Sequence, residues 1–354
     1  MYRALIAVTL MGLMPGPLAA ADDDDAGPLG QLPRSFTGTL PAASGAGVDW
    51  QLDLLADGSF QLRRTDLDPA SDGAEDAIGR WFVGSDEDSL LLAGGEEAIA
   101  FAIESPDRLQ LLDQAARPID PATDEALKSA EVALFEPELE LRGRYRYMAD
   151  AALFEECLTG RRLPVAFTED NLALERAYLD LQETTGLAPG EPALAELIGR
   201  IALLPPMEGD GFIPQLEPVR FLSVHADATC PEPFTQATLA GPDWLLQDLS
   251  DMPIVLAADQ RRPHLTLIED GQRVVGFAGC NRLSGGVETD DAELRFGPTA
   301  VTMMACPVGM DLEAALLGAL EATQRYRILG RQLDLFDAGG APLARFEAGV
   351  AETR

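Results

Sequence analysis

Short runs of alternating apolar and polar residues, divided by turn-forming residues, follow one another through the first third of the chain. The dividing pairs include Asp57-Gly58, Gly94-Gly95 and Pro106-Asp107. Regularly spaced short strands of this kind are typical of an antiparallel barrel or sandwich. Strands are therefore predicted from Phe36 onward, at Asp49–Leu55, Ser59–Arg64, Arg80–Val83, Ser89–Leu92, Ile99–Ile103 and Leu109–Leu112.

The middle of the chain holds a strand with aromatic residues, a polar segment with Cys157, a Thr-Gly turn and a strand that begins at Leu163. Asp170 is expected to cap a helix that continues to about Gln182, and Gly186 to end it. Further strands are predicted around Ala193–Leu203 and Val219–Val224. A helix between the third and fourth strands of a five-stranded barrel fits this order.

The C-terminal third has one helical pattern followed by three strand patterns. Residues 311–326 form an amphipathic stretch in which Leu312, Leu316, Ala319 and Leu320 share one stripe. Strands are predicted at Tyr326–Leu329, Leu333–Phe336 and Pro342–Phe346.

The N-terminus has the pattern of a secretory signal, residues 1–21. Arg3 is followed by an apolar run from Ala4 to Met14 and by the small residues Ala19-Ala20-Ala21. No cysteine near this cleavage site could accept a lipid. We therefore expect a soluble, unlipidated protein of the periplasm or the exterior, which begins with a flexible acidic segment, residues 22–33.

The net charge of −33 excludes some classes of partner. An acidic surface of this size repels nucleic acid and anionic membranes, and the sequence holds no basic groove pattern. Beyond the N-terminus, no apolar run approaches the roughly 20 residues that a membrane-spanning helix needs.

The sequence offers no recognisable catalytic, cofactor-binding or metal site. The two histidines, His225 and His264, lie in different parts of the chain, and no nucleophile elbow, phosphate loop or dinucleotide fingerprint occurs. Met303, Met304 and Met310 lie near Cys306 and could bind Cu(I), but packing is the favoured role of these methionines. The protein is therefore expected not to be an enzyme.

The even number of cysteines in an exported chain favours disulfides over metal ligands. They are Cys157, Cys230, Cys280 and Cys306, and four cysteines allow three pairings.

The first part of the chain resembles the N-terminal domain of the NlpE family, copper-resistance and envelope-stress lipoproteins of the Gram-negative outer membrane. The resemblance is carried by Ser35–Pro41, Gly47–Trp50, Asp57–Phe60, Gly79–Trp81 and Leu109–Asp113. It implies a lipocalin-like antiparallel barrel. The two cysteines of the family's copper-binding loop are replaced by Ala42 and Gly45, so copper binding there is not expected.

The other two parts have resemblances of their own. The Tyr-Met-Ala-Asp-Ala-Ala run at 147–152 and the turn after Cys157 resemble the OB-like second domain of the same family. The Gly-Cys-Asn motif at 279–281 and the Ala-Cys-Pro motif at 305–307 resemble the META domain, the family that includes HslJ. These resemblances imply a mainly β protein with an α+β C-terminal part.

The expected organisation has three units. They are a first barrel (34–117), an OB domain (139–232) and a META domain (241–348), with a linker at 118–138. These boundaries select the pairs Cys157–Cys230 and Cys280–Cys306. The resemblance also suggests a link between the first pair and signalling, although a structural role is favoured.

The function expected from the resemblance is envelope stress sensing or homeostasis through contacts with unidentified envelope proteins, without a cofactor. Weak handling of copper or another metal is the alternative. The oligomeric state stays open.

Overall fold

The computed structural model describes residues 27–41, 45–71, 73–94, 98–113, 119, 125–207, 209–232, 234–249, 252–256 and 260–349. The expected signal peptide and residues 22–26 lie outside this part. Within it, 22 strands and two helices form a mainly β protein, as predicted. None of the helices in the described ranges is long and apolar enough to cross a membrane.

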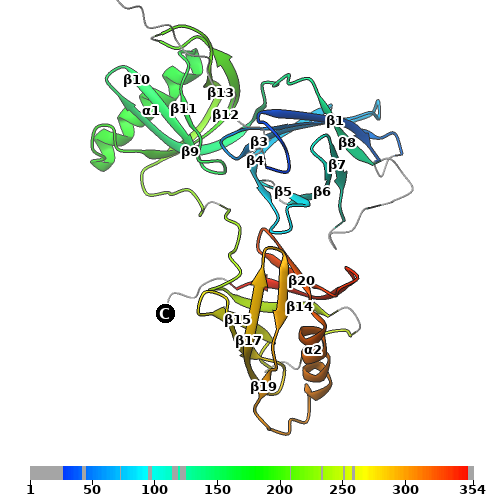
Figure 1. The fold of residues 1–354 in the computed structure, drawn as a ribbon. Coiled ribbons are helices and arrows are strands. Elements are labelled where there is room, and N and C mark those ends of the chain that lie inside the picture. The colour runs from blue at the N-terminus through cyan, green and yellow to red at the C-terminus, as the bar shows by residue number, and fades with distance from the viewer. Residues whose placement is uncertain are drawn as a thin grey trace, which may run out of the picture.

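The first unit is a closed antiparallel barrel of eight strands, seen at the upper right of Figure 1. The strands are β1 (Arg34–Leu40), β2 (Val48–Leu54), β3 (Ser59–Asp66), β4 (Ala74–Val83), β5 (Ser89–Ala93), β6 (Ile99–Ser105), β7 (Arg108–Leu111) and β8 (Ala126–Ala130). All six runs predicted as strands are strands. Phe36, Leu52 and Phe101 are fully buried inside the barrel, which explains the alternation seen in the sequence.

Strand β8 lies inside the segment 118–138 that was expected to be a linker. It closes the barrel, because Phe36 of β1 pairs with Ser129 and Leu109 of β7 pairs with Leu127. A side chain at Gly38 would place a Cβ atom 2.7 Å from the carbonyl oxygen of Ala126, so the close approach of β1 to β8 requires glycine there. The expected linker is wrong at these positions, since neighbouring strands hold this short segment in place.

The second unit is a five-stranded sheet with one helix. Its strand order is β11-β10-β9-β12-β13, and an isolated bridge between Val165 and Leu216 brings its two ends together. The strands are β9 (Glu138–Met148), β10 (Ala151–Glu156), β11 (Arg162–Pro164), β12 (Ala193–Leu204) and β13 (Ile213–His225). Helix α1 (Glu169–Thr185) lies between the third and fourth strands, as predicted.

The N-terminal cap of α1 differs from the prediction. Thr168, not Asp170, is the capping residue, and its hydroxyl accepts a hydrogen bond from the N–H of Asn171 at 3.1 Å. Asp170 instead lies in the first turn, where its negative charge faces the positive end of the helix dipole. Gly186 ends the helix with φ 77°, as expected.

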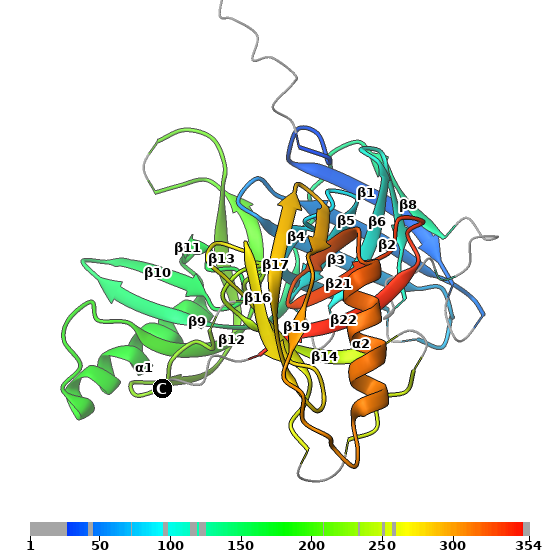
Figure 2. The ribbon, with the colours of Figure 1, turned by 60° about the horizontal axis from the view of Figure 1, so that its bottom comes forward.

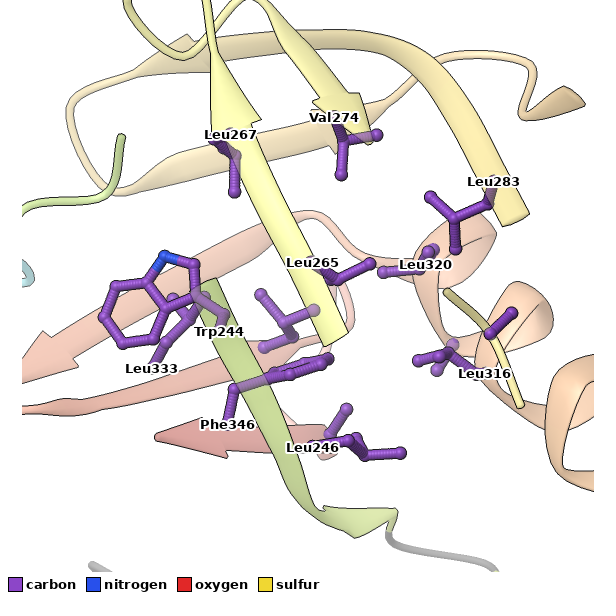
Figure 3. Close-up of a cluster of buried hydrophobic side chains, with 14 of the residues drawn as sticks. Trp244, Leu246, Leu265, Leu267, Val274, Leu283, Leu316, Leu320, Leu333 and Phe346 are labelled. Atoms are coloured by element: carbon purple, nitrogen blue, oxygen red, sulfur yellow. The ribbon is translucent and has the colours of Figure 1, made fainter. Parts of the chain in front are cut away.

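The third unit is a nine-stranded sheet in which eight strands close into a ring through the additional pairing of β16 with β17. The strands are β14 (Asp243–Leu249), β15 (His264–Ile268), β16 (Arg273–Phe277), β17 (Arg282–Asp290), β18 (Glu293–Phe296), β19 (Ala300–Val301), β20 (Arg325–Leu329), β21 (Gln332–Phe336) and β22 (Pro342–Ala348). Helix α2 (Met310–Ala322) contributes Leu316 and Leu320 to the same buried cluster as Trp244, Leu265 and Phe346 (Figure 3).

Helix α2 ends earlier than predicted. Thr323 is extended, with φ −64° and ψ 130°, and Tyr326 belongs to β20, where it pairs with Leu335. Sheet pairing therefore takes over the end of the stretch that was predicted to be helical, while the whole apolar stripe stays in α2.

The third unit contacts the first barrel at the turn between β4 and β5. The N–H of Ser85 donates to the carbonyl oxygen of Ile328 at 3.1 Å, and the N–H of Ile328 donates to the Ser85 hydroxyl at 2.8 Å. Asp86 lies 3.9 Å from the Arg327 guanidinium. In Figure 2 the molecule is tilted so that the third unit, at the bottom of Figure 1, comes forward in front of the first two units.

Candidate functional site

The structure joins Cys157 to Cys230 by a disulfide with a Cα–Cα distance of 5.3 Å. Cys157 lies directly after β10 and is buried, whereas Cys230 lies five residues after the end of β13 and is half-buried. The bond therefore ties the β10–β11 turn to the segment that leads out of the second unit. We call that segment, residues 226–242, the connector.

The turn that carries Cys157 is organised by a buried carboxylate. One oxygen of Glu156 accepts the N–H of Leu158 at 2.9 Å. The other accepts both the N–H and the hydroxyl of Thr159, at 2.7 and 2.6 Å. Gly160 closes the turn with φ 73°, a conformation that favours glycine. Cys157 is thus held in a fixed position for its partner.

Arg161, which follows this turn, contacts the first barrel. Its Nε lies 3.4 Å from an oxygen of Asp57, in the β2–β3 turn. Burial lowers the pKa of Arg161, while the charges of Asp57 and Glu156 act in the opposite direction. The cysteine-bearing turn is therefore coupled directly to the first unit.

The connector also contacts both flanking units beyond Cys230. The ring of Phe234 packs against Phe82 of the first barrel, with 5.3 Å between centroids. The side chain of Gln236 donates to the carbonyl oxygen of Val83 at 3.1 Å, and the N–H of Ala237 donates to Gly330 of the third unit at 2.8 Å. Three units thus meet along a segment that the Cys157–Cys230 bond anchors.

Sequence reasoning found the two cysteines but missed Glu156, Arg161 and Phe234. Arg161 and Phe234 act through contacts to distant parts of the chain, whereas Glu156 acts on the turn that follows it. The only local signal is the position of Glu156 and Arg161 on either side of the Cys-x-Thr-Gly turn.

The second unit also presents apolar side chains to solvent. Met207 and Phe212, in the loop between β12 and β13, are 72% and 69% exposed. Exposed aromatic and methionine side chains are enriched at protein interfaces. We call this pair the β12–β13 tip.

The second disulfide, Cys280–Cys306, lies within the third unit and has a Cα–Cα distance of 5.8 Å. Asn281, which follows Cys280, joins its own segment to the segment that holds Thr302 and Met304. Its side-chain oxygen accepts the N–H of Met304 and the hydroxyl of Thr302, each at 2.8 Å. Its N–H donates to the buried carboxylate of Glu313 at 2.6 Å. This bond therefore belongs to a dense structural network.

The methionines near Cys306 are not packed in the core. Met303 is 99% exposed, and Met304 and Met310 are also exposed. The favoured packing role for these residues is wrong, because the segment that carries them runs along the outside of the third unit.

The two histidines lie in different units of the described structure. Among the described residues, no group of three His, Cys, Asp or Glu side chains could hold a metal ion. His225 is exposed at the end of β13, and His264 is buried in β15 of the third unit. Gly45 is described, whereas Ala42 lies outside the described residues.

Comparison with protein families finds three matches in succession. Residues 36–121 match the NlpE N-terminal domain, residues 136–231 the NlpE C-terminal OB domain, and residues 237–350 the META domain.

Among curated proteins, the chain is 35% identical over 149 residues to lipoprotein NlpE of Escherichia coli (strain K12). The aligned region covers 42% of this chain and 61% of that relative, so the chain spans less than two thirds of the relative's length.

Two solved structures are also similar. The crystal structure of the Cpx pathway activator NlpE from Escherichia coli is 28% identical, covering 57% of this chain and 100% of that chain, with a TM-score of 0.26. The NMR structure of a protein from Burkholderia xenovorans is 33% identical, covering 36% of this chain and 96% of that chain, with a TM-score of 0.28.

Proposed function

The chain carries the two domains of NlpE followed by a META domain, and from this premise we propose that it is a non-catalytic cell-envelope protein that senses stress through contacts with other envelope proteins. The observation that carries the proposal is the 35% identity over 149 residues to a lipoprotein of the NlpE type. The β12–β13 tip supports it, because exposed Met207 and Phe212 offer apolar surface for a partner.

The proposal includes a location. A chain with the predicted signal would be exported, and without a cysteine near Ala19–Ala21 it would remain free of lipid. The similar protein of Escherichia coli is named a lipoprotein. Lack of a lipid anchor would therefore distinguish the two proteins.

We further propose that signalling by this protein depends on whether the Cys157–Cys230 bond has formed, and therefore on oxidative folding. Its loss would free the connector from the second unit, and the connector contacts both other units. A purely structural role of the same bond is the simpler alternative.

The test is a reporter of envelope stress in cells that produce the full chain or variants of it. We expect Met207→Ser/Phe212→Ser to lower the reporter signal and to reduce the recovery of cross-linked envelope proteins. Met303→Ser/Met304→Ser is the matched control, because it removes two exposed apolar side chains from a different unit. Equal signals from wild type and the tip variant would contradict a role of the tip in contacts.

Weak copper handling is the second candidate, and one observation favours it. The thioethers of Met303, Met304 and Met310 are exposed, and such soft sulfur atoms suit Cu(I). Titration of the purified chain with Cu(I) should separate the two candidates. A stoichiometric site that is lost in the Met303→Ser/Met304→Ser variant would support the second.

A further inference from the structure

A hollow of about 550 Å³ lies on the third unit, where strands β15, β16, β17 and β19 are neighbours. Paired residues form two rows across these strands. One row is His264, Phe277 and Arg282, and the other is Thr266, Val275, Ser284 and Ala300. Opposite residues of an antiparallel pair share one face of a sheet.

The residues between these rows face inward. Leu265 and Leu283 belong to the buried core of the unit (Figure 3). The hollow therefore lies on the outer, solvent-facing side of the strands, and a ligand can reach it without opening the core.

The charge of this hollow is unlike that of the rest of the protein. Arg261 and Arg282 line it, and no carboxylate does so among the described residues. Four other hollows of the structure are each lined by at least one carboxylate, from Asp113, Asp49, Asp227 or Asp57. Two positive charges thus lie together on a chain whose net charge is −33.

Arg261 is held in place by its neighbours. Its guanidinium donates to Nε2 of His264 at 3.1 Å and lies 6.0 Å from the ring centroid of Phe277. Because Nε2 accepts this bond, the proton of the neutral ring is on Nδ1, which donates to the carbonyl oxygen of Arg262 at 3.2 Å. The buried His264 therefore orients Arg261, and it is a positioning residue.

Arg282 and Ser284 have unused donors. Within the described part of the chain, neither the Arg282 guanidinium nor the Ser284 hydroxyl has a hydrogen-bond or ion-pair partner. The two threonines of the hollow are already engaged: Thr302 donates to Asn281, and Thr266 donates to Asp243 at 2.5 Å. The contact with Thr266 places the carboxylate of Asp243 beside the hollow.

We propose that this hollow binds a phosphate group, through the guanidinium groups of Arg261 and Arg282 and the hydroxyl of Ser284. A guanidinium presents paired N–H donors that match phosphate oxygens. A phosphate monoester carries about −1.5 to −2 charges at pH 7, which two arginines neutralise. The phosphate is that of a small soluble compound or that of a lipid headgroup.

The first test is titration of the full-length protein with inorganic phosphate at constant ionic strength, followed by NMR of the arginine Nε–H signals. Saturable shifts of Arg261 and Arg282 are expected. Arg282→Gln should weaken binding at least tenfold, and Ser284→Ala by a smaller factor. Arg295→Gln is the control, since it removes the same charge from an exposed arginine of the third unit that is paired with Glu293.

His264→Gln gives an independent check, with Arg282→Lys as the conservative variant. His264→Gln should weaken binding although its own side chain does not touch phosphate, and Arg282→Lys should retain part of the affinity. Thermal melting of each variant verifies that it is folded. No saturable phosphate binding by the wild type, or equal affinities for Arg282→Gln and Arg295→Gln, would overturn the proposal.

The source of the phosphate is decided with two further probes. Glycerol 3-phosphate represents soluble monoesters, and vesicles of phosphatidylglycerol in phosphatidylcholine represent headgroups. If only glycerol 3-phosphate binds, and Arg282→Gln weakens that binding, the ligand is a soluble compound. If the vesicles bind, and Arg282→Gln weakens that binding, the ligand is a lipid. Binding of either probe that does not change in Arg282→Gln would count against the site.

Discussion

Arg161 of the second unit lies 3.4 Å from Asp57 of the first barrel, four residues after Cys157 in the chain. The side chain of Arg161 is 13% exposed and that of Asp57 is 50% exposed. A mostly buried cation thus bridges the two units at the point where the disulfide begins. Any change that moves the turn after Cys157 also moves this ion pair.

Arg161→Ala should therefore destabilise the junction of the first two units. The variant removes this cation and leaves the carboxylates of Asp57 and Glu156 without their counter-charge, a loss that costs about 1–3 kcal/mol. Arg162→Ala is the control, because Arg162 is exposed and pairs with Glu155 at the surface, where ion pairs contribute roughly 1 kcal/mol or less. Urea denaturation followed by circular dichroism measures both. Equal midpoints for the two variants would show that the Arg161 contact does not stabilise the fold.

Replacing both Cys157 and Cys230 with serine separates a staple from a sensor. With a sequence separation of 73 residues, chain-entropy arguments give a loss of about 4.4 kcal/mol. A staple predicts a lower melting temperature alone. A sensor predicts a changed envelope-stress signal while the protein stays folded.

The Cys280→Ser/Cys306→Ser variant is the matched control for that experiment. It removes a bond with a separation of 26 residues, for which the same argument gives about 3.5 kcal/mol. It should lower stability without a change of signal. Non-reducing peptide mapping of the exported protein verifies the pairs, and any crossed pair would refute the assignment of Cys157–Cys230 and Cys280–Cys306 to separate units.

Asp53 should make stability depend on pH. It is fully buried in β2, and burial raises its pKa, an effect that hydrogen bonds from Ser35, Phe135 and Gln51 partly offset. A carboxyl group with a raised native pKa destabilises the fold once pH exceeds its unfolded pKa of about 3.9. The stability of Asp53→Asn relative to wild type should therefore increase between pH 4 and pH 7. Asp49→Asn, which changes an exposed carboxylate of the same strand, controls for the lost charge.

The first barrel should not bind copper tightly. The positions that would carry cysteines in the resembling family are Ala42 and Gly45, which offer no donor atoms. A chain of residues 22–130, which includes all eight strands of the barrel, should lose Cu(I) to a chelator probe in competition. Stoichiometric retention of Cu(I) by that fragment would disprove this prediction.

The mature protein should begin near Ala21 or Asp22 and carry no lipid. This follows from Arg3, the apolar run behind it and the absence of a cysteine near the cleavage site. Intact-mass measurement of protein from its native envelope decides it. A mass excess equal to acyl chains would mean that the protein is anchored.

The sequence predicted the strands that have their own turn signals and missed a strand that lacks them. Strands β2 and β3 are joined through Asp57-Gly58, and the signal is local. In β8, only Leu127 is a large apolar residue, and the strand exists because β1 and β7 both pair with it. Local patterns do not contain such information.

Two other differences have a similar origin. Thr168 and Asp170 are both suitable helix caps, and the sequence alone did not decide which one begins α1. The contact between Arg161 and Asp57 joins residues 104 positions apart, so no periodicity could indicate it. The candidate site was therefore predictable at its cysteines but not at the contacts around them.

The position of β8 has a consequence for any fragment of this protein. The match to the NlpE N-terminal domain ends at residue 121, before β8 begins at Ala126. A chain cut at that residue would expose the unpaired backbone edges of β1 and β7. Unprotected edges of this kind recruit strands from other molecules, so the shortened chain would self-associate into aggregates, whereas one that continues to Ala130 would remain monodisperse.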